Sequence, residues 1–514
     1  MVQPDRPVAE HGSVRHPLGG RLPVIEHVPV RLDPSELEEV DRLAARIRTA
    51  VPGIDATSMF GDRVRAGFGA GPSLYVHDLS PVQLAGRWTP SPLEYRAFML
   101  AGEGDFVALW MPRNPAFEAY CRDVLGLGAV EVLRPAAKVR RGALAARVIQ
   151  DGGLLTRLAD VARRRGGLNV QPYIGSGAVW ALAGAIGEQA GVTVHVVAPP
   201  PGVTRRVNDK TWFARQAAEL LGERALPDTT VAHSMAALAA RVRRLAHDHD
   251  RIAIKLPSAA GGEGNAVLDA ACVRDLPLAA VRETLRGLLR RLGWPRPFPL
   301  LVSVWESPVC TTPSVQLWIP HAAEGLPVVE GVFEQQVCGP TGVFTGAVPA
   351  DLPEHTAIRI AREAVLLAAL FQRLGYFGRC SFDAILVGAD PATAELHWIE
   401  CNGRWGGTSI PMTLVNRLTG DWAETPFAVV APEQPGPPAF DEALERMGDR
   451  LFSAGRRRGV VFLSPGDGTG RGLAFLALAP TAAAACRDAS EASAILADGA
   501  DGTRTCSARR PRGA

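Results

Sequence analysis

The sequence has few cysteines for its length, and they do not fall into pairs. Its 514 residues include eight cysteines, none of them in a C-x-x-C arrangement. No cysteine spacing suits a structural zinc site. This pattern argues against a disulfide-stabilised secreted domain. It predicts a reduced protein located in the cytoplasm.

A strong net charge and a long apolar run are also missing. The formal net charge is +2, which argues against a large nucleic-acid interface. Two short arginine runs, at 163–165 and 456–458, are interpreted as solvated helix ends or loops. No apolar run reaches the roughly 20 residues of a membrane-spanning helix. Residues 1–26 lack the apolar segment of a signal peptide. We therefore expect neither a nucleic acid nor a membrane as partner.

The chain does contain enough apolar residues for several cores. Hydrophobic residues make up 47% and charged residues 21% of the sequence, and the length corresponds to about three domains. Proline-rich stretches at 199–201 and 432–438 suggest boundaries between them. The predicted division is a flexible leader at 1–30, an α/β domain at 31–205, a central domain at 206–431, a C-terminal α/β segment at 440–498 and a disordered tail at 499–514.

Between about 90 and 205, strand-like and helix-like segments alternate. This alternation favours a parallel sheet with helices on both faces. The stretch Gly175-Ser176-Gly177 lies between a strand and a helix but lacks the rest of a dinucleotide-binding motif, so we interpret it as a tight turn. The expected strands lie at 106–110, 130–133, 168–174 and 192–197.

The strongest chemical signal comes from two apolar strands predicted at 378–387 and 395–402. Glu400 and Asn402 are two residues apart, so on a strand they face the same side. Asp383 on the neighbouring strand can meet them there. Two carboxylates and an amide oxygen form a set of hard ligands suited to Mg²⁺. The alternative is a surface hairpin with ordinary polar residues.

Two neighbours of these residues have different expected roles. Arg404 follows in a glycine-rich loop, where a guanidinium can hold a phosphate or carboxylate through two parallel hydrogen bonds. A lone arginine is usually a surface charge. Cys401 lies between the two ligands in sequence, so its side chain should point to the opposite face, into the core, and we do not count it as catalytic.

An earlier strand ends at Lys255 and is followed by a loop of small residues and a second strand. Lys255 is well placed to face a phosphate, and the loop 256–264 can bring backbone N–H groups close to it. The loop is not a Walker A motif, because no G-K-[ST] follows and a strand rather than a helix comes next. A flexible hairpin is the alternative.

Two more features complete the set of candidates. Lys210 stands in the first turn of a helix that Asp209 is expected to cap. A lysine there opposes the helix dipole, so it is explained by a nucleotide phosphate or is a surface lysine. The strand at 300–304 runs into Trp305 and Glu306 and can offer backbone groups to an adenine. A core strand with a rim glutamate is the alternative.

The order of these features resembles that of the ATP-grasp superfamily, and the resemblance covers about 200–410. The preceding segment is similar to a pre-ATP-grasp domain. The stretches K-L-P-S-A-A-G-G-E-G-N and E-C-N-G-R-W-G-G are closer to peptide ligases of the pheganomycin type. The resemblance implies an α/β protein, α+β in its ATP-grasp part. A Rossmann-like pre-ATP-grasp domain would precede a two-lobed ATP-grasp domain, with the nucleotide-clamping lobe at about 206–320 and the metal lobe at about 321–431.

The resemblance also implies an activity. An ADP-forming ligase would activate a small-molecule carboxylic acid as an acyl-phosphate and join it to the amine of an amino acid or peptide, in natural-product biosynthesis. Such enzymes use ATP and Mg²⁺, with Mn²⁺ as a substitute, and a homodimer is expected. Asp383, Glu400 and Asn402 would hold the metal, and Arg404 and Arg379 would stabilise the reacting groups. The implied nucleotide contacts are Lys210, Lys255, Ser258, Gly261, Gly262, Gly264, Asn265, Val304, Trp305 and Glu306.

Other activities remain open at this point. The same metal site would serve carboxylation or phosphotransfer, and a non-catalytic nucleotide-binding module is a further alternative. A dinucleotide-dependent oxidoreductase is disfavoured by the incomplete glycine motif. No acid suited to a ribose occurs at 313–316. Glu306, Glu330 and Glu334 could pair with a cationic substrate or could be rim charges.

Overall fold

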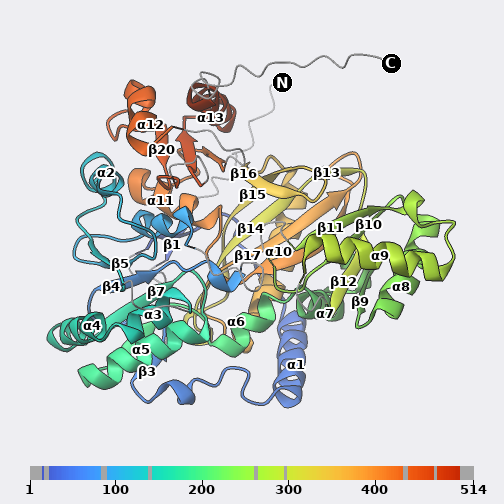
Figure 1. The fold of residues 1–514 in the computed structure, drawn as a ribbon, viewed down its shortest axis with the longest axis horizontal. Coiled ribbons are helices and arrows are strands. Elements are labelled where there is room, and N and C mark those ends of the chain that lie inside the picture. The colour runs from blue at the N-terminus through green and yellow to red at the C-terminus, as the bar shows by residue number, and fades with distance from the viewer. Residues whose placement is uncertain are drawn as a thin grey trace, which may run out of the picture.

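The computed structural model describes the chain in eight stretches, which contain a parallel sheet, a small antiparallel sheet and a large antiparallel sheet (Figure 1). This arrangement confirms the predicted mixed α/β class. The described residues are 14–16, 22–82, 90–136, 142–259, 264–294, 298–431, 438–467 and 472–497.

The parallel sheet is built from the first third of the chain, in the order β3-β8-β7-β4-β5-β6. Alternate residues of its strands enter two different cores. Leu74 packs with the helices α3 to α5 on one face, and Tyr75 packs with η4 and α2 on the other. Helices therefore cover both faces, as the alternation predicted. The elements are β3 (Val64–Ala66), β4 (Ser73–Val76), η4 (Pro92–Met99), β5 (Phe106–Ala108), α2 (Pro115–Ala119), β6 (Glu131–Leu133), α3 (Leu144–Gln150), α4 (Gly152–Arg165), β7 (Leu168–Pro172), α5 (Gly177–Ala190) and β8 (Val194–Val196).

The turn after β7 has the shape that the sequence predicted. A Cβ atom added to Gly175 would lie 2.6 Å from the carbonyl oxygen of Pro199, so only glycine fits. A short turn therefore connects β7 to α5. Tyr173, just before this turn, is left at the carboxyl end of the parallel sheet, where α/β proteins bind ligands.

The small antiparallel sheet has the order β11-β10-β12-β9 and is packed against two helices. Its hairpin pairs Lys255 with Asn265, as the sequence predicted. Asp209 caps the helix α7 by accepting from the N–H groups of Thr211 and Trp212, at 2.8 and 3.1 Å. The elements are α7 (Lys210–Leu221), β9 (Thr229–Ala232), α8 (Met235–Asp248), β10 (Arg251–Lys255), β11 (Asn265–Asp269), α9 (Leu278–Leu292) and β12 (Leu300–Val304).

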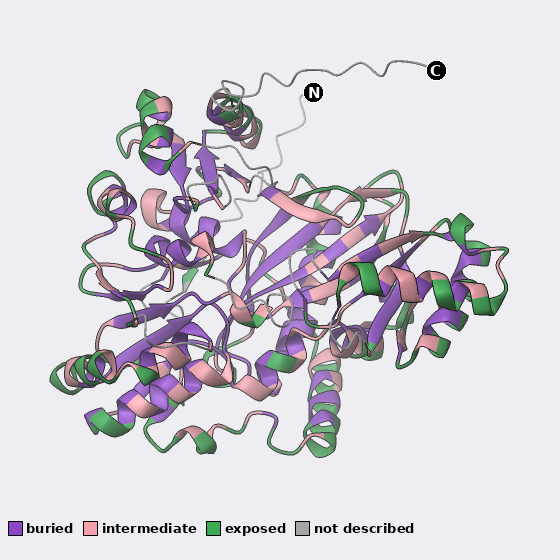
Figure 2. Ribbon diagram, in the orientation of Figure 1, coloured by how far each residue is buried: buried purple, intermediate pink, exposed green. Residues whose placement is uncertain are grey.

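The large sheet occupies the middle of the molecule, and its strands are mostly buried (Figure 2). Two of its strands, β17 and β18, have the bounds expected from the sequence. The helices α1 and α10 pack against the sheet. The elements are α1 (Pro34–Ala50), β13 (Val309–Thr311), β14 (Pro313–Ile319), β15 (Val328–Cys338), β16 (Val343–Pro349), α10 (Glu354–Arg373), β17 (Gly378–Val387), β18 (Glu395–Asn402), α11 (Ser409–Thr419) and β19 (Phe427–Val430).

The C-terminal segment continues this large sheet. The strand β21 (Phe475–Leu478) pairs with β19 on one side and with β20 (Gly459–Phe462) on the other. Two helices, α12 (Phe440–Met447) and α13 (Ala482–Ala497), lie beside these strands at the top of Figure 1. Because β21 begins at Phe475, residues 472–474 lie before it.

The prediction of a flexible leader over residues 1–30 is wrong for its second half. Val24 and Ile25 are fully buried in β2 (Val24–Glu26), which pairs with β1 (Val14–His16). The ring of His27 contacts the carbonyl oxygen of Glu330 at 2.7 Å and a carboxylate oxygen of Asp421 at 2.8 Å. These contacts span about 300 and 400 residues, which a local pattern does not reveal. Residues 1–13 and 17–21, and the predicted tail at 499–514, lie outside the described residues.

The prolines at 199–201, where a domain boundary was predicted, lead directly into a helix. The helix α6 (Pro201–Val207) begins within them, which suits the fixed backbone angle of proline. Within the part of the chain that the structure describes, no helix is long and apolar enough to cross a bilayer.

Candidate functional site

A cavity of about 920 Å³ lies between the three larger sheets and the C-terminal segment. This volume is near the upper end of the range for small-molecule sites, roughly 300–1,000 Å³. Most of its charged side chains come from elements far apart in the sequence. The charged residues that line it are Arg96, Lys210, Arg251, Lys255, Glu306, Asp383, Glu400 and Arg404.

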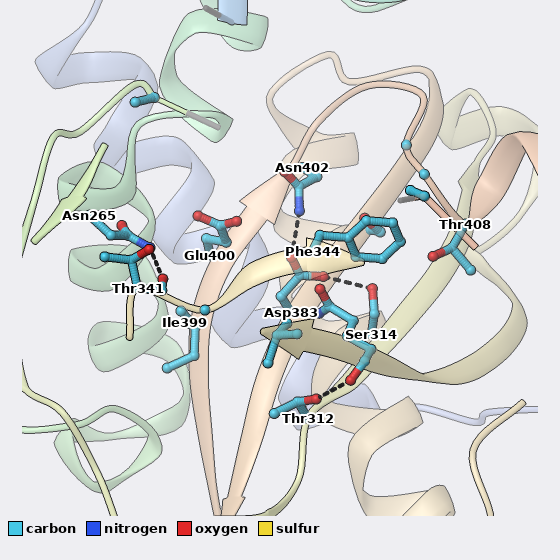
Figure 3. Close-up of a pocket in the computed structure, with 18 of the residues that line it drawn as sticks. Asn265, Thr312, Ser314, Thr341, Phe344, Asp383, Ile399, Glu400, Asn402 and Thr408 are labelled. Atoms are coloured by element: carbon cyan, nitrogen blue, oxygen red, sulfur yellow. Dashed lines mark hydrogen bonds between the residues drawn. The ribbon is translucent and has the colours of Figure 1, made fainter. Parts of the chain in front are cut away.

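Two carboxylates face each other on neighbouring strands of the cavity wall. Asp383 on β17 pairs directly with Glu400 on β18. Asp383 accepts a hydrogen bond from Ser314 Oγ at 2.6 Å and another from Asn402 Nδ2 at 2.7 Å (Figure 3). The structure thus brings together the three residues that the sequence suggested as metal ligands.

The two carboxylates have opposite electrostatic surroundings. Burial raises the pKa of Asp383 to about 7, and the charge of Glu400 adds to this shift. Burial also raises the pKa of Glu400, but Lys210, with Nζ 2.7 Å from Oε2, outweighs it, and the net pKa is lowered. Glu400 is therefore ionised at neutral pH, while Asp383 is partly protonated there and a nearby cation would favour its ionised form.

The donor set fits a magnesium ion bound together with a nucleotide. Two carboxylates and an amide leave coordination positions for phosphate oxygens and water, as Mg²⁺ prefers. Over the described stretches, no group of three or more His, Cys, Asp and Glu side chains could hold a metal by itself. The amide oxygen of Asn402 accepts from Arg404, so the amide must turn before Asn402 can be a ligand. Its role as a ligand stays a prediction.

Two buried lysines stand opposite the carboxylates. Lys210 is the first residue of α7, and its Nζ donates to the carbonyl oxygen of Ala259 at 2.5 Å as well as contacting Glu400. Lys255 ends β10. Burial lowers the pKa of Lys255 to about 8, while Glu400 opposes this shift and Lys210 adds to it. The two ammonium groups share one firmly ionised carboxylate, which leaves positive charge available for phosphates.

The structure places only part of the glycine-rich loop at the cavity. Asn265 lines it and donates to the carbonyl oxygen of Thr341 at 3.3 Å. Ser258 is exposed and Gly264 is buried, and neither lines the cavity. Gly261 and Gly262 lie outside the described residues.

The cavity is also lined by the end of β12 and the two residues that follow it, namely Val304, Trp305 and Glu306. The N–H groups of Val304 and Trp305 already donate to the carbonyl oxygens of Asp228 and Arg251, at 3.1 and 3.0 Å. These two amides are therefore not free to hydrogen-bond an adenine, which corrects that part of the sequence interpretation. The ring of Trp305 lies 5.4 Å from the guanidinium of Arg251 and offers a flat face instead.

Arg404 links the carboxylates to the parallel sheet. Its guanidinium donates to the amide oxygen of Asn402 and lies 6.0 Å from the ring centre of Tyr173. The next residue, Trp405, donates its N–H to the carbonyl oxygen of Tyr173 at 3.1 Å. The loop that carries Arg404 is therefore fixed against the carboxyl end of β7.

Arg379 does not line the cavity, contrary to the prediction that it contacts the reacting groups. Its side chain is buried in an ion pair with the fully buried Glu330. The guanidinium lies 5.3 and 5.2 Å from the ring centres of Trp318 and Trp405. Burial lowers the pKa of Arg379 to about 9. The sequence interpretation could not see Glu330 as its partner, because 49 residues separate the two.

Other sequence interpretations can be checked against the cavity wall. Of the three acids proposed for a cationic substrate, only Glu306 lines the cavity, with a carboxylate oxygen 3.4 Å from His397 Nδ1. Glu334 instead accepts from the N–H of Thr312 at 3.1 Å. Cys401 is buried in the core on the far side of β18, as expected.

Several lining residues were missed by sequence reasoning. Ser314 and Gln316 are two apart on β14 and face Asp383 and its neighbours, which only the pairing of β14 with β17 reveals. Arg96 carried a local signal, because it is the single charge in the run Tyr95 to Leu100. The other missed residues include Leu79, Leu93, Tyr173, Phe344, Thr408 and Leu473.

Comparison with known proteins supports one class of fold. Residues 94–188 match the sequence family described as the pre-ATP-grasp domain. This match lies within the parallel-sheet part of the chain. The family match concerns this part of the chain, and the fold of the part that follows is compared with solved structures below.

Particular solved structures share this architecture. The ADP complex of PurK, N5-carboxyaminoimidazole ribonucleotide synthetase, aligns with a TM-score of 0.51 at 12% identity, over 86% of this chain and 100% of that one. The Aspergillus clavatus N5-carboxyaminoimidazole synthase with ADP and 5-aminoimidazole ribonucleotide gives 0.50 at 13%, over 83% and 99%. The biotin carboxylase–β,γ-ATP complex of Campylobacter jejuni gives 0.51 at 12%, over 83% and 92%. No curated protein sequence matches the chain. At these identities the likeness establishes the fold.

Proposed function

We propose that this protein is an ATP-dependent carboxylate–amine ligase that forms ADP. The observation that carries the proposal is the pairing of Asp383 and Glu400 opposite Lys210 and Lys255 in one cavity. Opposed carboxylates and ammonium groups are what a metal-bound triphosphate needs. The similar structures that contain ADP or ATP support a nucleotide in this cavity.

Each group has a distinct role in the proposed reaction. Lys210 and Lys255 bind phosphate oxygens, and the face of Trp305 lies beside the base. Asp383, Glu400 and Asn402 would hold Mg²⁺, which supplies charge neutralisation at the phosphates when it is bound. Arg404 is placed to stabilise negative charge on the reacting acyl group.

The reaction has two steps. A substrate carboxylate oxygen attacks the γ-phosphorus, forming an acyl-phosphate and releasing ADP. The amine nitrogen then attacks the acyl carbon, loses a proton and displaces phosphate, which leaves an amide. The buried ammonium and guanidinium groups neutralise charge and hold the reactants in place, and such positioning supplies much of the rate in phosphoryl transfer.

The nature of the substrates is a finer proposal. An amino acid or peptide as amine, with a product of natural-product biosynthesis, follows from the resemblance of the E-C-N-G-R-W-G-G stretch to pheganomycin-type ligases. A cytoplasmic homodimer is part of the same proposal. Carboxylation is the second candidate, because two of the similar folds are carboxyaminoimidazole synthetases and one is a biotin carboxylase.

A screen of substrate pairs distinguishes these outcomes. Purified protein with ATP and Mg²⁺ is expected to release ADP and phosphate over many turnovers only when a suitable acid and amine are both present. Mass spectrometry should then show an amide product. ADP release that requires bicarbonate, with a carboxylated product, would replace the ligase by the second candidate. Failure to bind ATP would refute both.

The affinity for Mg²⁺ is expected to depend on pH in a defined direction. Burial raises the pKa of Asp383 to about 7, so a cation must displace a proton from it below that pH. Affinity should fall by up to about tenfold per pH unit below pH 7 and level off above it. Calorimetric titration of Mg²⁺ into the ATP-analogue complex checks this, and equal affinity at about pH 6 and about pH 8 would contradict it.

A further inference from the structure

Arg96 is a buried cation without a counter-ion. It lies in η4, is 6% exposed and lines the cavity. Its Nε is buried and has no hydrogen-bond partner. Among the described residues, no carboxylate forms an ion pair with it. Burial lowers its pKa, and the group that opposes this shift is the phenol of Tyr173 rather than an acid.

The neighbours of Arg96 do not supply the missing charge. His77 follows β4, is fully buried, and has no partner for either ring nitrogen. Burial and the charge of Arg96 lower the pKa of His77 to about 3, so it is neutral. The carboxylate of Glu94, two residues before Arg96, accepts instead from the N–H groups of Trp110 and Met111, at 2.8 and 3.1 Å.

A buried guanidinium that lacks an anionic partner indicates a binding site for an anion. Burial of an unpaired charge is expensive. A guanidinium presents donors in a planar fork that matches a carboxylate. Because Arg96 faces the cavity and none of the described carboxylates pairs with it, we expect a bound ligand to supply the anion. Lys210, by contrast, already has a carboxylate partner in Glu400.

Arg96 comes from a different part of the fold than the proposed phosphate-binding lysines, since it lies in η4 whereas Lys210 begins α7 and Lys255 ends β10. Arg404 lies against the ring of Tyr173, and that ring lies 5.9 Å from the ring of His77, on which the charge of Arg96 acts. Tyr173 is thus a common neighbour of Arg404 and of the His77–Arg96 group. The helix that carries Arg96 is fixed in place, since Arg417 of α11 donates to the carbonyl oxygens of Met99 and Ala101, at 2.5 and 2.9 Å.

The cavity wall also offers apolar surface from the same domain and from the C-terminal segment. Leu79 lies shortly after β4 and Leu93 lies in η4, while Phe344 comes from β16 and Leu473 from the stretch before β21. A ligand that pairs with Arg96 would therefore contact apolar side chains as well as the guanidinium. Burial of this apolar area favours a ligand with a hydrocarbon body.

We propose that Arg96 binds a non-reacting carboxylate of the substrate, and that the apolar body of the substrate packs on Leu79, Leu93, Phe344 and Leu473. In the proposed reaction Arg404 faces the reacting acyl group, so we assign the reacting carboxylate to Arg404 and a different carboxylate to Arg96. This inference rests on the proposed ligase function and narrows it to an apolar substrate that keeps a free carboxylate, such as an amino acid or peptide with its carboxyl terminus unmodified.

The test uses N-acetylphenylalanine and its primary amide, which differ only in the carboxylate. Calorimetric titration without nucleotide should show at least tenfold tighter binding of the acid by the unmodified protein. Arg96→Gln should abolish this preference. Arg251→Gln, which removes another arginine of the same cavity, should keep it. Equal binding of acid and amide by the unmodified protein overturns the proposal, and tighter binding of phenyl phosphate than of the acid overturns the choice of a carboxylate.

Stability and nucleotide binding separate this role from others. Because Arg96 has no partner, Arg96→Gln and Arg96→Met should leave the Tm of the ligand-free protein unchanged or raised. A lowered Tm in both variants, with the acid preference intact in either, would show a structural role and refute the proposal. Both variants should bind a fluorescent ATP analogue as the unmodified protein does. If the unmodified protein did not bind the ATP analogue, the proposed function would be refuted instead.

Discussion

Glu400→Gln is expected to lower the rate of ADP formation by about 10²–10³-fold, the loss seen when one preorganised charge-stabilising group is removed. The change keeps the size of the side chain and removes the carboxylate that faces Asp383 and contacts Lys210 at 2.7 Å. Without it, the two buried lysines lose the anion they share, and Asp383 is left as the only carboxylate among the three proposed ligands. Single-turnover ADP release at saturating Mg²⁺ measures the effect.

A control on the same strand separates this effect from a general disturbance of β18. Glu395 begins that strand, and its side chain is 81% exposed outside the cavity. Glu395→Gln should therefore release ADP at the unmodified rate. If Glu400→Gln combined with Asn402→Ala also turned over at that rate, the metal site would lie elsewhere.

Glu330→Gln is expected to destabilise the protein by about 3–5 kcal/mol, because it leaves the charge of Arg379 buried without its partner. Glu330 is fully buried, and its pair with Arg379 lies against the rings of Trp318 and Trp405. Solvent cannot replace the lost carboxylate at that depth. Urea unfolding followed by tryptophan fluorescence gives the free energy of unfolding.

A double variant tests both the energetics and the role of Arg379. Glu330→Leu with Arg379→Met removes both charges, and most of the lost stability should return, since buried pairs are often replaced by apolar residues at little cost. The folded double variant should still form ADP, because Arg379 does not line the cavity. If the double variant folded but formed no ADP, the prediction that Arg379 is a catalytic residue would be supported again.

The sequence was sufficient to predict the structure where the residues of a pattern are close together in the chain. The bounds of β17 and β18 could be predicted because their apolar residues alternate and a Gly-Ala-Asp turn separates them. The same is true of the N-cap Asp209 and of the hairpin that pairs Lys255 with Asn265. In each case the residues that determine the structure lie in one continuous stretch of the chain, the longest being 378–402.

The remaining features depend on contacts between distant parts of the chain. Nothing near Arg379 marks Glu330 as its partner, and the burial of Val24 depends on β15 and its neighbours. The amides of Val304 and Trp305 looked available because their acceptors, Asp228 and Arg251, belong to other strands or loops. Arg96 could be noticed as a charge in an apolar run, but its lack of a counter-ion is visible only in three dimensions.

The place of the C-terminal strands has a consequence for the order in which the protein is made. Leu473 and Ala474 complete the cavity wall, and β21 pairs with β19 of the large sheet. Because synthesis proceeds from the N-terminus, the parallel sheet and both lysines emerge from the ribosome well before this wall exists. A nascent chain can therefore fold the parallel sheet and expose Lys210 and Lys255 early, whereas the cavity wall is completed only after residues 473–478 have been added.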